Sequence, residues 1–292
     1  MAGSSVPYQG TTRAFAGLTN YFSPMITRKR PKRAHSAMRM LGAALAILIL
    51  ETHASDARTL MFAGRSWTVR PTGAGSPGPR NYPNHWCEEN AWVDSSGQLH
   101  LKIEKRDGQW CCAEVWSDDL LGFGRYEWYV IGRIDRLDKN IVLGLFPYLG
   151  PSGRNEIDIE TAAWGKANGN RENFTVWPAK GGLSKTSRRF PFSLTGGYTT
   201  HRLIWQKTSV LFQMLHGHRT GNDNEIARWE YKPSRYLDKI PGAAMSTHMN
   251  LWLFRGSSPS DGKEAEVIIR AFRFDKQRDP LADKQREGLA EK

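Results

Sequence analysis

The sequence predicts an all-β protein built as a sandwich of two sheets. Between residues 98 and 275, short runs of alternating apolar and polar residues recur at regular spacing, separated by Gly, Asp, Asn and Ser. No stretch between Ala57 and Asp275 keeps the apolar period of a helix. Tryptophan is abundant, with 11 residues, and supplies large side chains for a packed core. These observations favour a sandwich over alternating strands and helices.

The expected strands follow one another along this region. Residues 98–105 (QLHLKIEK) alternate after the turn signal DSSG. The other expected strands are 112–117 (CAEVWS), 124–134 (GRYEWYVIGRI), 140–150 (NIVLGLFPYLG), 156–160 (EIDIE), 173–178 (NFTVWP), 200–206 (THRLIWQ), 209–215 (SVLFQML), 249–254 (MNLWLF) and 265–275 (AEVIIRAFRFD). We expect Trp67, Trp86, Trp92 and Trp205 to lie in the core or at its edge.

Residues 1–57 are predicted to be a lead followed by an export signal. A basic segment, RKRPKRAHSAMR, precedes the apolar run MLGAALAILIL and the small residues of THASDA. The apolar run is shorter than the roughly 20 residues that cross a bilayer. We therefore expect a secreted or periplasmic protein without stable membrane association, the alternative being an uncleaved anchor. Residues 58–275 are expected to form one domain, and residues 276–292 a charged tail.

The charge balance is basic but scattered. The formal net charge is +12, and beyond residue 57 the chain still carries 34 basic and 27 acidic residues. An excess of this sign suits an anionic envelope or polymer. It is not clustered in a way that names a nucleic-acid partner, and none is expected.

Three cysteines suggest a single disulfide. In an exported chain we expect Cys87 to bond one of the adjacent residues Cys111 and Cys112, which leaves one thiol over. The alternative is three buried thiols. Because no CxxC or Cys/His spacing is present, no catalytic metal is expected.

The segment EIDIE places three acids on one face of a strand. Glu156, Asp158 and Glu160 alternate with Ile157 and Ile159, so the acids share one face and the isoleucines the other. Crowded like charges cost stability, and either a charged edge strand or catalysis would explain them. A retaining glycosidase needs two carboxyl groups about 5–5.5 Å apart. Glutamates four residues apart can approach this distance on a concave sheet, where crowding also raises the pKa of at least one acid.

Several segments in order resemble family sixteen of the glycoside hydrolases, the β-glucanase and transglycosylase family. EIDIE fits its E-x-D-x-E signature, and CAEVWSDDLLGFGRYEWYV is similar to the strand pair that precedes this signature in lichenases. NHWCEENAWVDSSGQLHLKI, THRLIWQKTSVLFQMLHG and MNLWLFRG resemble further family segments. The resemblance implies a β-jelly-roll sandwich, concanavalin A-like, with a concave substrate cleft. The uninterrupted EIDIE favours the lichenase-like or transglycosylase-like relatives over those with a bulged signature.

The resemblance implies a role for each acid. Glu156 would be the nucleophile, Glu160 the general acid/base and Asp158 their electrostatic partner. The implied activity is that of a retaining endo-glycosidase, which hydrolyses a β-linked glucan or related polysaccharide through a covalent intermediate. The alternatives are a transglycosylase that uses the same residues, or a non-catalytic carbohydrate-binding jelly roll. No cofactor is implied, although the family allows a structural calcium.

Substrate contacts are also implied by the resemblance. Glu114, Asn250 and Trp252 match positions that face the glycan in lichenase-like relatives, while Trp116 stands where those relatives carry arginine. Two further tryptophans, Trp164 and Trp177, are expected to be sugar platforms or core residues, and His201 is expected to be structural. Thr161-Ala162-Ala163 replaces the Phe-Leu-Gly that follows the signature in lichenases, so strict lichenase specificity is not expected. The basic run 185–189 (KTSRR) is expected to be a solvated loop, with contact to an acidic polymer as the alternative.

Overall fold

The structure is a computed structural model that describes residues 57–73, 82–150, 153–167, 169 and 171–277. The chain divides into two compact units, Met1–His53 and Ala54–Lys292, and all described residues belong to the second. The expected export signal and nearly all of the expected tail lie outside the described residues, so those boundaries stay predictions. Within the described part, no helix has the length and apolar character needed to cross a membrane.

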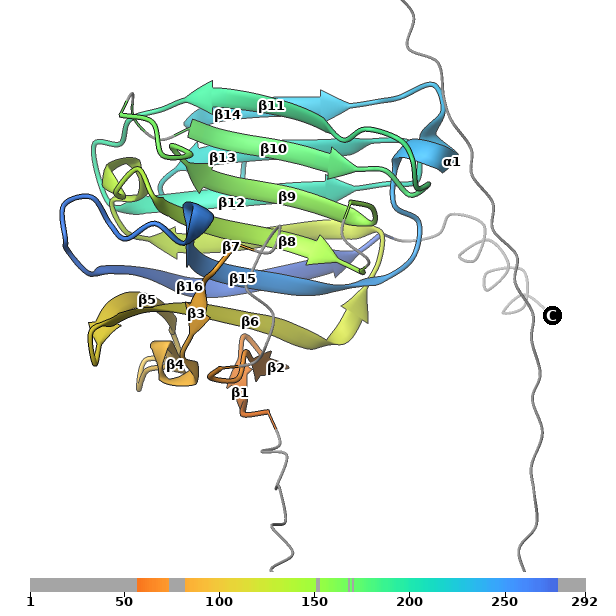
Figure 1. Ribbon diagram of the computed structural model, residues 1–292. Coiled ribbons are helices and arrows are strands. Elements are labelled where there is room, and N and C mark those ends of the chain that lie inside the picture. The colour runs from red at the N-terminus through yellow and green to blue at the C-terminus, as the bar shows by residue number, and fades with distance from the viewer. Residues whose placement is uncertain (1–56, 74–81, 151–152, 168, 170, 278–292) are drawn as a thin grey trace, which may run out of the picture. The chain divides into compact units, whose positions relative to one another are not determined.

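The described residues form two stacked sheets, and the expected all-β fold is confirmed (Figure 1). The front sheet contains β1 (Thr59–Phe62), β2 (Arg65–Val69), β6 (Gln109–Leu121), β8 (Ile141–Tyr148), β9 (Glu156–Ala162), β10 (Arg171–Trp177), β11 (Thr186–Pro191) and β15 (Met245–Leu253). The back sheet contains β4 (Ala91–Val93), β5 (Leu99–Arg106), β7 (Gly124–Ile131), β12 (Tyr198–Trp205), β13 (Val210–His216), β14 (Glu225–Tyr231) and β16 (Ala265–Lys276). The short β3 (His85–Trp86) pairs with β6.

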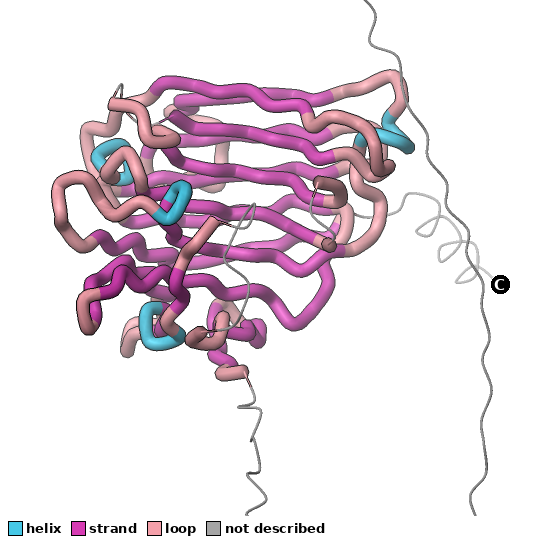
Figure 2. Tube along the Cα trace, viewed as in Figure 1, coloured by secondary structure: helices cyan, strands magenta, loops and turns pink. Residues whose placement is uncertain are grey.

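Helical segments are short and few among the described residues (Figure 2). They are α1 (Tyr236–Lys239), η2 (Glu88–Asn90), η3 (Ile134–Arg136) and η4 (Phe254–Gly256). The two sheets join through the antiparallel pairing of β5 with β6, where Arg106 lies opposite Gln109. The main hydrogen-bonded path therefore runs without a break from β11 at one end to β14 at the other.

The core lies between the two sheets. Ile157 and Ile159 of β9 point into it, and the rings of Phe174 on β10 and Phe212 on β13 stack across it with centroids 5.0 Å apart. The expected core tryptophans Trp67, Trp86 and Trp205 are buried, and Trp92 stacks on His100 at the edge, so this expectation is confirmed. Each fully buried large apolar side chain contributes about 1.5–3 kcal/mol.

The disulfide joins Cys87 to Cys111, which confirms the expected bridge. Successive residues on a strand point to opposite faces, so only one of the adjacent cysteines can face Cys87. The other, Cys112, is a buried thiol, and burial raises its pKa to about 12. A thiol with this pKa stays protonated near neutral pH and is a poor nucleophile.

His201 on β12 faces the core, in agreement with a structural role. Its Nδ1 lies 2.7 Å from Oε1 of Glu172, and Glu172 also accepts a hydrogen bond from Thr161 at 2.8 Å. Thr199 contacts the other imidazole nitrogen at 3.1 Å. These groups are fully or almost fully buried. They form a polar cluster whose members satisfy one another between the sheets.

Candidate active site

The three acids of β9 lie on the outer face of the front sheet, the face that points away from the back sheet. β9 runs between β8 and β10, so both of its edges are paired. Because the isoleucines of the segment are buried in the core, the alternation of a strand places Glu156, Asp158 and Glu160 on the opposite side. We call these three residues the acid row.

The strand register defines the neighbours of the acid row. Glu156 lies opposite Trp177 on β10 and Tyr148 on β8. Asp158 lies opposite Thr175 on β10. Glu160 lies opposite Asn173 on β10 and Gly144 on β8. Adjacent strands are roughly 5 Å apart, so these side chains surround the acids directly.

Asp158 is a buried acid with a strongly raised pKa. Its side chain is buried, and Nε1 of Trp177 donates a hydrogen bond to its Oδ2 at 2.9 Å. Burial, together with the charge of Glu156 and a hydrogen bond to it, raises the pKa of Asp158 well above its ordinary value. The Trp177 indole and the positive charge of Lys185 act in the opposite direction but do not prevail. Asp158 therefore keeps its proton to higher pH than an exposed aspartate does, beside the Glu156 carboxyl group.

Asn250 reaches over Gly144 toward the strand of the acid row. Gly144 pairs with Glu160 on one side and with Asn250 on the other. A Cβ atom at position 144 would overlap Oδ1 of Asn250, so the close approach requires glycine. In the described part of the structure, this buried Oδ1 has no hydrogen-bond partner. An oxygen in this position can accept a hydrogen bond from a ligand hydroxyl.

Glu114 of β6 is a buried acid that is kept ionised. Arg70 donates a hydrogen bond to its Oε2, and His248 Nδ1 lies 3.1 Å from its Oε1. Burial alone would raise the pKa of Glu114, but its hydrogen bonds and ion pairs with His248 and Arg70 lower the pKa overall. Glu114 lies opposite Asn250 across β6 and β15, and so continues the polar line that begins at Glu160.

An aromatic row crosses β6, β15 and β8 on the same face. The His248 ring stacks between Trp116 and Phe146, with centroid distances of 5.9 and 5.1 Å. Tyr148 meets the His248 ring edge-on at 5.6 Å. These side chains are half-buried, so part of their surface is available to a flat ligand.

Trp164 lies next to Glu160, at the end of the acid row. It follows β9 with a φ of 53°, a left-handed conformation that is costly for a non-glycine residue. Its indole donates a hydrogen bond to Asn173 at 3.0 Å, and the Asn173 amide donates to the Glu160 carbonyl at 2.9 Å. These contacts hold the Trp164 side chain against the strand that carries the acids.

The residues expected to bind substrate share one face with the acids but differ in exposure. Trp116, Trp164 and Trp177 are half-buried, whereas Trp252 is buried beneath Tyr82 and Trp164. The sequence did not identify Phe146 and Tyr148, although they alternate with Gly144 on an expected strand, nor His248, which precedes the expected strand 249–254 and belongs to β15. No pattern in the sequence pointed to Arg70.

One sequence expectation is wrong in part. The basic run was expected to be a solvated loop; Ser187 to Arg189 are exposed, as expected, but Thr186 to Arg189 belong to β11, an edge strand of the front sheet. Lys185 immediately precedes this strand, and its Nζ lies 4.4 Å from the Trp177 ring centroid. The run therefore stands beside the acid row.

A group of potential metal ligands in the described residues is His85, Cys87 and Cys111. Its two cysteines are joined in the disulfide, so they cannot supply thiolates. The expected absence of a catalytic metal and the structural calcium allowed by the resemblance stay predictions.

The two-sheet topology defines a β-jelly-roll sandwich of the type found in glucanases. The β-glucanase of Bacillus licheniformis is 19% identical, with a TM-score of 0.52, covering 73% of this chain and 92% of that one. A β-1,3-glucanase of Mycobacterium marinum is 20% identical, with a TM-score of 0.52 and coverages of 71% and 90%. A pseudo β-1,3-glucanase of Mycobacterium tuberculosis is 16% identical, with a TM-score of 0.54 and coverages of 73% and 91%.

No protein-family model and no curated protein matches the sequence. At these low identities the solved structures establish the fold of the chain. The expected jelly-roll fold is thereby confirmed, and the chemistry has to be argued from the site itself.

Proposed function

We propose that the protein is a retaining glycoside hydrolase that cleaves a β-linked glucan or a related polysaccharide. The observation that carries the proposal is the acid row on the outer face, in which Asp158 is buried beside Glu156 and has a pKa raised well above its ordinary value. A sheet face with three crowded acids and no structural need for them is typical of a catalytic site. The glucanase fold supports the same activity.

Each acid has a defined task in the proposed reaction. Glu156 attacks the anomeric carbon while Glu160 gives its proton to the departing glycosidic oxygen, which yields a covalent glycosyl-enzyme and a shortened chain. Glu160, now a carboxylate, takes a proton from water. That water displaces Glu156 from the sugar. Two inversions restore the original β-configuration. Asp158 stabilises the charge of Glu156 by sharing its proton before attack and after release.

The remaining residues of the face position the sugar chain. The aromatic row of Trp116, His248 and Phe146 offers flat surfaces for pyranose rings. The unpaired Oδ1 of Asn250 accepts a sugar hydroxyl, and the ionised Glu114 accepts another at the far end of the line. We also propose that the protein is exported, since the Cys87–Cys111 disulfide suits an oxidising compartment.

The test is a product assay of the full chain on a panel of polysaccharides. The panel holds mixed-linkage β-glucan, laminarin, xyloglucan, chitin, agarose and carrageenan, each with and without a labelled acceptor oligosaccharide. New reducing ends on one polymer, absent with Glu156→Gln, support hydrolysis. Labelled chimeric products would show that the protein is a transglycosylase instead of a hydrolase. Binding without any product would show that it is a non-catalytic carbohydrate-binding protein.

The retaining mechanism has its own test. Glu160→Ala should lower turnover of an aryl glycoside by about 10²–10⁴-fold, because the general acid/base is lost. Azide should restore part of the rate by entering the vacated space and attacking the glycosyl-enzyme. A β-glycosyl azide product is expected, and an α-azide would contradict the mechanism.

A further inference from the structure

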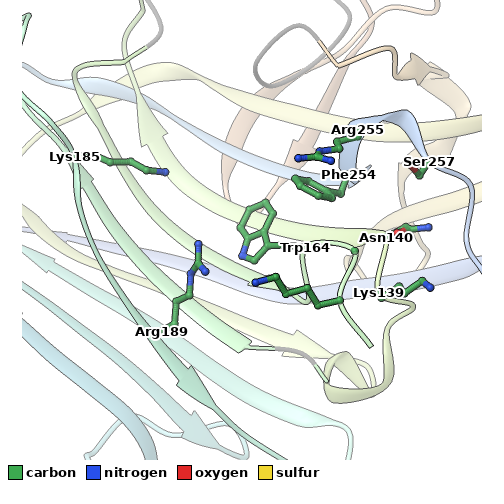
Figure 3. Close-up of a pocket in the computed structure, with 10 residues that line it drawn as sticks. Lys139, Asn140, Trp164, Lys185, Arg189, Phe254, Arg255 and Ser257 are labelled. Atoms are coloured by element: carbon green, nitrogen blue, oxygen red, sulfur yellow. The ribbon is translucent and has the colours of Figure 1, made fainter. Parts of the chain in front are cut away.

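A basic pocket opens beside the acid row. It has a volume of about 630 Å³, and its lining includes Lys139, Lys166, Lys185, Arg189 and Arg255 but no acid among the residues that the structure describes. Trp164 and Phe254 contribute aromatic surface (Figure 3). The pocket is adjacent to the acids because Trp164 is tethered through Asn173 to Glu160, and because the charge of Lys185 acts on Asp158.

One wall of the pocket comes from β11 and the residue before it. Lys185, Ser187 and Arg189 alternate, so they share one face of this strand. Lys185 lies over the Trp177 ring, Ser187 Oγ contacts Thr175 Oγ1 at 2.9 Å, and Arg189 pairs in register with Asn173.

The partners of this wall on β10 are the residues that face the acid row. A cationic strand therefore runs parallel to the acid row at a separation of two strand spacings, roughly 10 Å.

The opposite wall is built from three turns that are fixed to one another. The Gly165 amide donates to the Lys139 carbonyl at 2.8 Å, and the Phe254 amide donates to the Asn140 carbonyl at 2.7 Å. Trp164 and Arg255, which both line the pocket, have left-handed φ values of 53° and 58°. Such strain in non-glycine residues persists only when surrounding contacts impose it, and it clusters at binding sites.

Most of these cations lack an acidic partner. In the described ranges of the chain, Lys139, Lys166, Arg189 and Arg255 form no ion pair with a carboxylate. Asp138 precedes Lys139 and receives its hydrogen bonds from Ser260 and the Asn140 amide. Against the effect of burial, these bonds and the charge of Lys139 lower the pKa of Asp138 without a direct ion pair. Like charges gathered in a hollow repel one another, and an anionic ligand would relieve this repulsion.

From this pocket we infer that the substrate is an acidic polysaccharide, whose carboxylate or sulfate ester groups bind the basic pocket while neighbouring sugars lie over the acid row. The inference rests on the proposed function. Trp164 and Phe254 suit the apolar face of a pyranose ring, and the cations suit its charged substituent. A nucleic acid fits less well, since its continuous phosphates would run onto Glu156 and Glu160.

The test compares polymers that differ only in charge. Binding of Glu156→Gln protein is measured on neutral mixed-linkage β-glucan, on the same glucan partly oxidised to carboxylates, and on a partly sulfated form. We expect at least one anionic form to bind roughly 10-fold more tightly at low ionic strength, because each exposed ion pair contributes modestly. Comparison of the oxidised with the sulfated glucan shows whether the pocket prefers carboxylate or sulfate ester groups. The preference should shrink as salt is added.

Charge variants then assign the preference to the pocket. Lys166→Gln/Arg189→Gln/Arg255→Gln should bring the ratio of anionic to neutral affinity close to one. The matched control, Lys105→Gln/Lys207→Gln/Lys276→Gln, also removes three charges, from exposed lysines in or next to the back sheet, and should keep the ratio. Thermal unfolding verifies that both variants are folded.

The outcomes separate the two proposals. If native protein cleaves a neutral glucan but shows no anionic preference, the acidic-polysaccharide inference fails and the proposed hydrolase stands. If no polymer is bound or cleaved, both fail. Retention of the preference by the triple variant would overturn the role of the pocket. Equal competition by single-stranded DNA would overturn the specificity for sugar.

Discussion

Two carboxyl groups of this molecule are equally buried but have opposite partners. Glu127 on β7 and Asp158 on β9 are each 3% exposed. Glu127 receives a hydrogen bond at 2.7 Å from Arg202 and another at 2.7 Å from Arg125. Asp158 has a second carboxyl group, Glu156, as its neighbour, and the neutral indole of Trp177 donates a hydrogen bond to it at 2.9 Å.

The difference separates a structural acid from the acid that we assign to the proposed active site. Arg202 also donates to Gln213, Asn222 and the Gly221 carbonyl, so its charge is compensated and its donors are used. A buried pair of this kind is consistent with the ordinary rules of folding. Asp158 breaks these rules, because burial beside a like charge raises its pKa and costs stability. Such a cost is tolerated where chemistry depends on it.

The largest expected effect comes from the functional side of the comparison. Glu156→Ala should lower turnover by at least about 10⁴-fold, since the proposed nucleophile is lost. Thermal stability should change little, because relief of the crowding in the acid row offsets the lost hydrogen bond between Asp158 and Glu156. Initial rates and thermal unfolding of the same preparation measure both. Turnover close to that of the native protein would refute the nucleophile assignment.

At the structural acid Glu127 we expect the reverse, a loss of stability without a loss of activity. Arg202→Ala leaves Glu127 with a partial partner and should lower the free energy of unfolding by about 3–5 kcal/mol. The activity per folded molecule should not change. Chemical denaturation measures the loss, and the control Arg228→Ala, which breaks an exposed pair with Glu225, should cost less than about 1 kcal/mol. If Arg202→Ala lowered the free energy of unfolding as little as Arg228→Ala does, the structural role assigned to the Arg202–Glu127 pair would be wrong.

The pH dependence of stability sharpens the comparison at Asp158. Because its folded pKa is raised, Asp158 contributes stability below its ordinary value near 3.8 and loses that contribution as the pH rises through the folded value. Asp158→Asn cannot ionise and should therefore gain in melting temperature relative to native protein as the pH rises. Melting curves at a series of pH values test this. A difference that does not change with pH would mean that Asp158 is not held protonated.

The smallest expected effect concerns the indole donor. Trp177→Phe removes a hydrogen bond worth about 0.5–1.5 kcal/mol. The indole lowers the pKa of Asp158, so its loss should move the pH-dependent change in stability to higher pH. The control Trp229→Phe, on β14 where the ring stacks on Phe212, should leave that pH unchanged. A shift to lower pH in Trp177→Phe would contradict the assigned contact.

The strands that the sequence revealed are those with an apolar face. β9 alternates isoleucine with acid, and its position, partners and outward acids follow from that pattern. β11 escaped detection because its Thr-Ser-Arg-Arg start has no alternating apolar residues. It is an edge strand with one open side, where charge replaces the apolar pattern and discourages aggregation.

The basic pocket could not be predicted because its residues come from separate turns. Lys139, Lys166 and Arg255 lie in three connections that only the folded chain brings together. The tryptophans show a related limit, since strand alternation gives the face of Trp252 but not the Tyr82 ring that covers it. Exposure depends on neighbours from distant segments.

β11, which forms one wall of the basic pocket, lies at the end of the hydrogen-bonded path, so we expect its backbone to be more mobile than that of the interior strands. Amide groups on the open side of an edge strand have no ladder partner, so such a strand exchanges its hydrogens and frays at lower free energy than the interior strands. A polymer that bridged Arg189 and the Trp164 side would fasten this strand to the sheet. Ordering the strand would reduce the net binding free energy, and occupancy would be visible as slowed amide exchange from Thr186 to Phe190.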